Sequence, residues 1–148
     1  MRIALIQSNP LVGDLQGNRL RLQEQCLQAS EAGADLALAP ELALWGYPPR
    51  DLLLQPSLQQ QQDRQLQQLS EALPPGLGLL LGVVETNGQR LFNAMALVEN
   101  TGWQLVARKR LLPSYDVFDE QRYFHSGEQP ALLKWGDKRL GLTLCEDL

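Results

Sequence analysis

The chain has 148 residues, of which 44% are apolar, and a formal net charge of −4. This length allows one domain with a real core, and the apolar share excludes a wholly disordered chain. The negative charge argues against binding to nucleic acid or to an anionic membrane, because both partners require a basic surface.

Apolar runs and cysteines set further limits. No apolar run is long enough to be a signal peptide or to span a bilayer, so we expect neither. The two cysteines, Cys26 and Cys145, form no disulfide framework, which indicates a cytoplasmic protein. With one histidine they also provide no zinc-type ligand set, so no metal site is expected.

The first half of the chain predicts alternating strands and helices. A first strand is expected at 2–8, and apolar residues at helical spacing predict an amphipathic helix over about 17–32. The short apolar run at 34–40 predicts a buried strand. After a loop rich in aromatic residues, glycine and proline, a second helix is expected at 57–73. We interpret its glutamine run, 59–62, as a solvated face.

The second half has the alternation and turn signals of antiparallel strands. The dipeptides Asn87-Gly88 and Gly136-Asp137 each predict a hairpin between two flanking strands. A third antiparallel strand is expected after the first hairpin. The predicted strands are 77–85, 90–99, 103–110, 131–135 and 138–144. With no internal repeat and no linker, the chain reads as one α/β unit.

Cys145 ends the last predicted strand. Alternation places Leu140, Leu142 and Leu144 on one face and Cys145 on the other, less apolar face. A cysteine at the start of a tight turn can present its sulfur, with backbone N–H groups nearby as oxyanion donors. The alternative is that Cys145 is a small apolar residue that closes the core, which is how we interpret Cys26. Spacing alone favours core packing for Cys145.

Two other segments carry polar residues next to predicted strands. In PELALWGYPPRDLLL, residues 40–54, Glu41 follows a buried strand and is either solvated or held in a pocket as a base. We expect Trp45 and Tyr47, which come just after it, to line that pocket, with core packing as the alternative. ARKRLLPSYDVFDEQRYF, residues 107–124, is on its own an exposed strand end and a loop.

Taken in order, Glu41, Lys109 and Cys145 in these contexts resemble the nitrilase, or carbon–nitrogen hydrolase, superfamily. More narrowly, four segments are similar to the glutaminase domain of the glutamine-dependent NAD+ synthetases. They are NPLVGDLQGN (9–18), PELALWGYPPRDLLL (40–54), KRLLPSYDVFDEQRYF (109–124) and LCEDL (144–148). The resemblance covers the whole chain and implies an α/β fold, the N-terminal part of a four-layer α-β-β-α nitrilase sandwich.

The resemblance also implies a role for each site residue. Cys145 would be the nucleophile, Glu41 the general base, and Lys109 the group that stabilises the tetrahedral oxyanion. A free thiol titrates near ~8.5, so at neutral pH it needs a base or a nearby positive charge. Three further residues complete the implied site: Glu120 beside the lysine, Tyr115 against bound glutamine, and Glu146 through its backbone N–H.

The chain departs from the subfamily pattern in one motif. Ser114 and Asp116 replace an asparagine and a glycine in the stretch before Phe118-Asp119-Glu120. Asp116 adds a negative charge near the expected glutamine pocket. The departure therefore concerns the substrate and leaves the catalytic assignment unchanged.

A nitrilase domain is considerably longer than this chain. Residues 1–148 are therefore expected to be an incomplete glutaminase domain, inactive alone, with the rest of that domain and a synthetase domain absent. The implied function of the full-length enzyme is hydrolysis of the amide of L-glutamine, which supplies ammonia for ATP-dependent NAD+ synthesis from deamido-NAD+.

Partners and alternatives follow from the same resemblance. No glycine-rich phosphate loop is present, so no cofactor is expected in these residues; ATP and Mg²⁺ would belong to the synthetase domain alone. The full-length enzyme is expected to be a homo-oligomer. One alternative is a stand-alone nitrilase-type amidase that acts on another small amide, and the other is a non-catalytic remnant.

Overall fold

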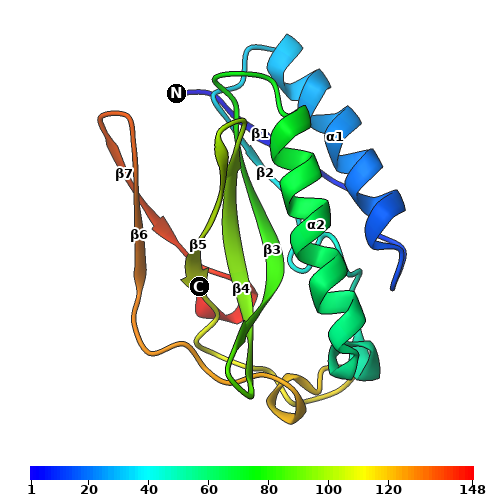
Figure 1. Ribbon diagram of the computed structural model, residues 1–148. Helices are drawn as coiled ribbons and strands as arrows, with labels where there is room; N and C mark the ends of the chain where they lie inside the picture. Colours follow the sequence, from blue (N-terminus) through cyan, green and yellow to red (C-terminus); the bar gives the residue numbers. More distant parts are fainter.

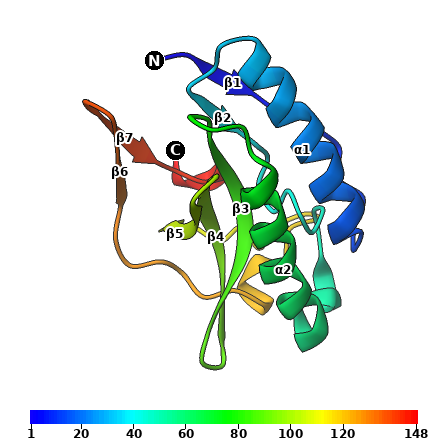
Figure 2. The same cartoon turned by 45° about the horizontal axis from the view of Figure 1, so that its top comes forward.

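Helices cover one face of a five-stranded sheet, and a separate β-hairpin lies against the other face, in a computed structural model that describes residues 1–148 (Figures 1 and 2). The helices are α1 (Leu15–Glu31) and α2 (Pro56–Ala72). The strands are β1 (Ile3–Leu5), β2 (Leu36–Leu38), β3 (Gly78–Asn87), β4 (Arg90–Glu99), β5 (Gly102–Arg108), β6 (Ala131–Trp135) and β7 (Lys138–Leu142). No helix is both long and apolar enough to cross a bilayer.

The large sheet has the order β1-β2-β3-β4-β5. The first three strands are parallel, whereas β3, β4 and β5 form an antiparallel meander. The strands β6 and β7 pair only with each other. Both predicted hairpins and the third antiparallel strand are confirmed. The strands β1 and β2 are shorter than predicted at both ends, and they stop before the polar residues Gln7 and Ser8 and before Pro40.

The helix α1 begins two residues before its predicted start. The Asp14 side chain accepts a hydrogen bond from the backbone N–H of Gly17 at 2.9 Å, which caps the first turn. Its buried face includes Leu15, Leu22 and Cys26 at helical spacing, as predicted. Cys26 is fully buried in the core, and this burial raises the pKa of its thiol to about 12.

The interpretation of the glutamine run as a solvated face is wrong for Gln62. Its side-chain oxygen accepts hydrogen bonds from Trp45 Nε1 and from the backbone N–H of Val84, each at 2.8 Å, and its amide donates to the Val84 carbonyl at 2.7 Å. The glutamine therefore joins α2 to β3 inside the protein. Trp45 is fully buried in the core, so its predicted place in the pocket is also wrong.

The face of the large sheet that β6 and β7 approach, here called the hairpin face, has its own apolar cluster. Its buried members are Leu36, Leu80, Met95, Leu97 and Ala107 of the large sheet, with Leu133 of β6 and Leu144. The hairpin covers this face only in part. On β1, Ile3 and Leu5 lie beside Leu36 and Leu38 in register and remain 44% and 73% exposed.

Candidate active site

A β-bulge in β5 determines where Lys109 points. The pairing of β4 with β5 shifts by one residue between Met95 and Ala96, which leaves Val106 as the extra residue. Successive side chains of a strand point to opposite faces. The extra residue therefore turns the side chains of Ala107 and Lys109 to the hairpin face, whereas strict alternation would place them on the helix face. Lys109 continues the pairing, donating its backbone N–H to the Asn93 carbonyl at 2.8 Å.

Lys109 lies at the centre of a buried ionic cluster. Its Nζ donates to Glu41 Oε1 at 2.7 Å and to Glu120 Oε1 at 2.8 Å. The lysine side chain is fully buried, Glu120 is almost so, and the Glu41 side chain is 22% exposed. Burial acts to lower the pKa of Lys109, but the hydrogen bonds and charges of the two carboxylates outweigh it and raise that pKa. Lys109 is therefore an ammonium.

The backbone of Glu41 crosses the hairpin face directly over β3. A Cβ placed on Gly82 would lie 2.1 Å from the backbone nitrogen of Leu42 and 2.7 Å from Cα of Glu41. The Gly82 N–H also donates to the Pro40 carbonyl at 3.2 Å. Only a glycine permits this close approach of two backbones. Gly82 thus brings Glu41 within reach of Lys109.

Two neutral donors complete the cluster, which holds two carboxylates and one ammonium. Asn93 Nδ2 donates to Glu41 Oε1 at 2.6 Å and is 3.4 Å from Glu120 Oε2. Tyr47 donates its hydroxyl to Glu120 Oε1 at 2.8 Å. Burial, followed by this hydrogen bond, raises the pKa of Tyr47, so the phenol keeps its proton. The predicted place of Tyr47 near the site agrees with this contact.

Cys145 begins a 3-10 helix, Cys145–Asp147, and not the end of a strand, because β7 stops at Leu142. Its backbone has φ of 48°, and its side chain is exposed while Leu144 is buried in the hairpin face. Partial desolvation of the sulfur and the charge of Glu41 raise the pKa of the Cys145 thiol. Lys109 and the backbone N–H of Glu146 act to lower it, and the net shift is upward.

An aspartate that the sequence did not single out joins the cysteine turn to the lysine segment. Asp147 Oδ1 accepts the backbone N–H groups of Arg110 at 2.9 Å and Leu111 at 2.8 Å. Because these residues directly follow Lys109, the contact fixes the position of the Cys145 turn relative to the ionic cluster. A carboxylate two residues after the cysteine is the only sequence signal for this tether.

Tyr115 lies beside the same turn and is largely open to solvent. Its hydroxyl donates to the Glu146 carboxylate, which raises the pKa of Tyr115. Its ring packs edge-on against Phe118, with centroids 5.6 Å apart. The structure therefore brings the predicted residues into two adjoining groups. Glu41, Lys109 and Glu120 form one group, and Cys145, Glu146 and Tyr115 form the other.

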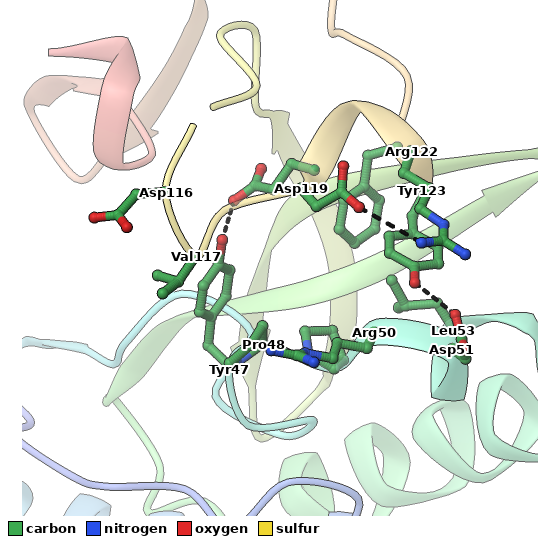
Figure 3. Close-up of a pocket in the computed structure, with 13 residues that line it drawn as sticks. Tyr47, Pro48, Arg50, Asp51, Leu53, Asp116, Val117, Asp119, Arg122 and Tyr123 are labelled. Carbon is green, nitrogen blue, oxygen red and sulfur yellow. Dashed lines mark hydrogen bonds and ion pairs between the residues drawn. The ribbon is translucent and has the colours of Figure 1, made fainter. Parts of the chain in front are cut away.

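A cavity of about 450 Å³ adjoins the cluster on the side of Glu120 (Figure 3). Tyr47 and Glu120 form part of its wall and are hydrogen-bonded to each other. Figure 3 also shows the hydroxyl of Tyr123 on Asp51. Cys145 does not line this cavity. No group of three or more histidine, cysteine, aspartate or glutamate side chains has the arrangement that would hold a metal ion.

The sequence profile of the family described as carbon-nitrogen hydrolase matches residues 2–148. The chain belongs to the carbon-nitrogen hydrolase family. This confirms the predicted family and, with the arrangement of helices and strands, the predicted fold class.

Known proteins resemble the chain over nearly its whole length. A glutamine-dependent NAD(+) synthetase from Synechocystis sp. is 44% identical over 153 residues, which cover 99% of this chain and 27% of that protein. The structure of a glutamine-dependent NAD+ synthetase from Acinetobacter baumannii, in complex with ADP, has a TM-score of 0.90 at 34% identity. The matched region covers 98% of this chain and 27% of the Acinetobacter baumannii synthetase chain.

A shorter enzyme also has the same fold. It is a variant of an amidase from Nesterenkonia sp. AN1 that shows covalent addition of the acetamide moiety of fluoroacetamide at the active site cysteine. Its TM-score is 0.84 at 27% identity, covering 99% of this chain and 56% of that one. The chain thus spans about a quarter of the length of the synthetases and about half that of the amidase.

Proposed function

We propose that this carbon-nitrogen hydrolase chain holds a Cys–Glu–Lys site that cleaves the C–N bond of a carboxamide. One observation supports this most strongly: a buried lysine is paired with Glu41 at 2.7 Å and Glu120 at 2.8 Å, next to a thiol on which Glu41 and Lys109 both act electrostatically. Since the pKa of Cys145 is raised, its resting form is the thiol. Its attack therefore requires a base, and Glu41 is the carboxylate with an exposed side.

The first half of the proposed reaction forms a thioester. Glu41 takes the Cys145 proton as the sulfur bonds to the amide carbon, and the carbonyl oxygen becomes an oxyanion. The Lys109 ammonium and the backbone N–H of Glu146 stabilise that oxyanion. Glu41 then returns the proton to the nitrogen, the C–N bond breaks, and ammonia leaves.

The second half regenerates the enzyme. Glu41 takes a proton from water as the water oxygen bonds to the thioester carbon, and Lys109 again faces the oxyanion. The S–C bond breaks, the carboxylic acid leaves, and the sulfur recovers its proton from Glu41. Glu120, which accepts hydrogen bonds from Lys109 and Tyr47, holds the lysine in place and exchanges no proton in this scheme.

L-glutamine is the amide that we propose, with NAD+ synthesis as the use of the released ammonia. The support is the similarity to synthetases described as glutamine-dependent, together with the four segments that resemble their glutaminase domain. Tyr115 is exposed beside the cysteine turn, where it is free to contact a bound glutamine.

A small aliphatic amide is the second candidate substrate. The amidase with the same fold supports it, and so does Asp116, whose negative charge next to Tyr115 in the sequence would repel the carboxylate of glutamine. The two candidates differ in the charge of the substrate, which gives a direct test.

The test uses a chloroketone analogue of glutamine. In the labelling step the sulfur of Cys145 bonds to the methylene carbon, chloride leaves, and the thiol proton passes to Glu41. We expect saturable labelling of Cys145, with protection by L-glutamine and none by butyramide. Protection by butyramide alone would support the aliphatic amidase, and labelling that neither amide slows would contradict both substrates.

Steady turnover by these 148 residues alone is not expected. Cys145 and Tyr115 are exposed, so water is not excluded from the reacting amide, and the oxyanion would form next to solvent, in a high dielectric. An ammonia assay with L-glutamine should therefore give no release above background while Cys145 is still labelled. Release of ammonia at an enzymatic rate would contradict this expectation.

A further inference from the structure

Asn93 is a buried amide that the mechanism above does not use. It lies in β4, is fully buried, and is flanked by apolar residues of the same strand. Its Nδ2 faces the carboxylates of both Glu41 and Glu120, at 2.6 and 3.4 Å. Its Oδ1 has no hydrogen-bond partner, although it is buried. A buried oxygen without a partner is unfavourable, so the contacts of Nδ2 are the reason that an amide fits here.

The two oxygens of Glu41 have different surroundings. Oε1 accepts from Asn93 Nδ2 at 2.6 Å and from Lys109 Nζ at 2.7 Å, whereas Oε2 accepts no hydrogen bond. Although Oε2 has no partner in the protein, it is not a buried atom, because the Glu41 side chain is 22% exposed. Because two strong donors already occupy Oε1, the oxygen with free lone pairs is Oε2.

Lys109 alone would not fix this difference. Its ammonium is a compact charge with three rotatable donors, and it is shared between Glu41 and Glu120. The last torsion of a glutamate is broad, so one donor leaves the carboxylate free to turn and to offer either oxygen to the ammonium. A second donor, held on a paired strand, fixes the plane of the carboxylate.

We propose that Asn93 is a positioning residue, which holds Oε1 of Glu41 so that Oε2 is the atom that takes the Cys145 proton. This inference rests on the proposed function, since it requires Glu41 to be the base. Asn93 touches neither the substrate nor the thiol and acts only through Glu41.

The test measures the rate at which iodoacetamide alkylates Cys145 at neutral pH, with the modified peptide identified by mass spectrometry. In this step the S–C bond forms, iodide leaves and the thiol proton passes to Glu41. We expect Asn93→Leu, which removes the donor at similar volume, to slow alkylation roughly 10- to 100-fold, as the loss of a hydrogen bond to a charged group predicts. Asn93→Ser, whose hydroxyl is too short to reach Glu41, should show the same loss if the leucine variant does not fold.

A double variant separates positioning from a general effect on structure. In a Glu41→Gln background there is no base to orient, so Asn93→Leu should cause no further loss of rate. Gln62→Leu is the matched control, because it removes another buried amide, one whose hydrogen bonds go to Trp45 and Val84 and not to Glu41 or Glu120, and it should lower thermal stability without slowing alkylation of the folded protein.

The outcomes distinguish this inference from the proposed function. If Glu41→Gln slows alkylation but Asn93→Leu and Asn93→Ser do not, Asn93 has no positioning role and the base assignment stands. A further loss in the double variant, equal to that of Asn93→Leu alone, would also overturn the inference. If Glu41→Gln reacts at the native rate, the proposed function fails, and the inference fails with it.

Discussion

At the scale of single residues, Lys109 should contribute most to the stability of the site. Replacing it with methionine leaves Glu41 and Glu120 facing each other without a cation, and removing one partner of a buried ion pair destabilises by about 3–5 kcal/mol. Urea unfolding followed by circular dichroism should show this loss. Lys134→Met, on an exposed position of β6, is the control and should change stability little. Equal losses in the two variants would contradict the buried cluster.

The same lysine gives a pH dependence with a definite sign. Because the folded protein raises the pKa of Lys109, the stabilisation is complete below the ordinary value of 10.5 and is lost as the pH rises through the higher folded value. The native protein should therefore lose more unfolding free energy above pH 10.5 than Lys109→Met does. Urea titrations of both proteins across this range would measure it, and parallel curves would argue against a raised pKa.

The sequence identifies the charged members of the site better than the neutral ones. Glu41, Lys109 and Cys145 each stand in a motif that resembles a known family, so their proximity could be predicted without geometry. Asn93 stands alone in an apolar strand, and only the structure shows that its amide meets two carboxylates. Asp147 is similar, since its partners are backbone N–H groups that no pattern of side chains reveals.

At the scale of elements, the contact between β3 and the segment after β2 places the base. Gly82→Ala would put a Cβ 2.1 Å from the Leu42 nitrogen, so the backbone that carries Glu41 must move. A displacement near 1 Å at a reacting group can reduce a rate by about 10²-fold. We expect a loss of roughly that size in the alkylation of Cys145.

A second glycine provides the control for this experiment. Gly141 lies in β7, and a Cβ added there would meet no atom within 4 Å. Gly141→Ala should therefore react with iodoacetamide at the native rate. If Gly82→Ala also reacts at that rate, the packing of Glu41 against β3 does not determine the position of the base.

Periodicity predicts most elements but cannot reveal the bulge in β5. Strict alternation from Trp103 would place Lys109 on the helix face, together with Leu105, away from Glu41 and Cys145. The extra residue Val106 reverses this at the end of the strand. Such a bulge follows from how two strands pair, and β5 read alone carries no signal for it. The family resemblance does not depend on strand register, so it could group Lys109 with Glu41, which lies 2.7 Å from it.

At the scale of the whole molecule, the incomplete cover of the hairpin face should be measurable. Leu5 is 73% exposed beside Ile3 on β1, at the end of the sheet that the β6–β7 hairpin does not cover. Exposed apolar surface of this kind binds hydrophobic dyes and promotes self-association. Leu5→Lys should lower both the dye fluorescence and the apparent mass in sedimentation.

An exposed leucine elsewhere tests whether position matters. Leu27, on α1, is 51% exposed but lies apart from the hairpin face. Leu27→Lys should change dye binding and sedimentation much less than Leu5→Lys. Equal effects would mean that general exposure of leucine, and not the uncovered sheet face, causes the association.

The fold class was predictable at this scale for a simple reason. Alternating strands and helices in the first half require a sheet with helices packed on it, and two strong hairpin signals in the second half extend the antiparallel part. The location of both helices on one face was not predictable from periodicity, since each helix shows only that it has one apolar side. The family resemblance supplied that arrangement, and Figure 1 shows it.

The most direct test of the proposed active site is the rate of Cys145 alkylation in the native chain and in Glu41→Gln at neutral pH. If Glu41 is the base for a thiol with a raised pKa, the variant should react at least about 10²-fold more slowly, with the adduct confined to Cys145. Equal rates in the two proteins, or an adduct on the buried Cys26 in place of Cys145, would contradict the proposed active site.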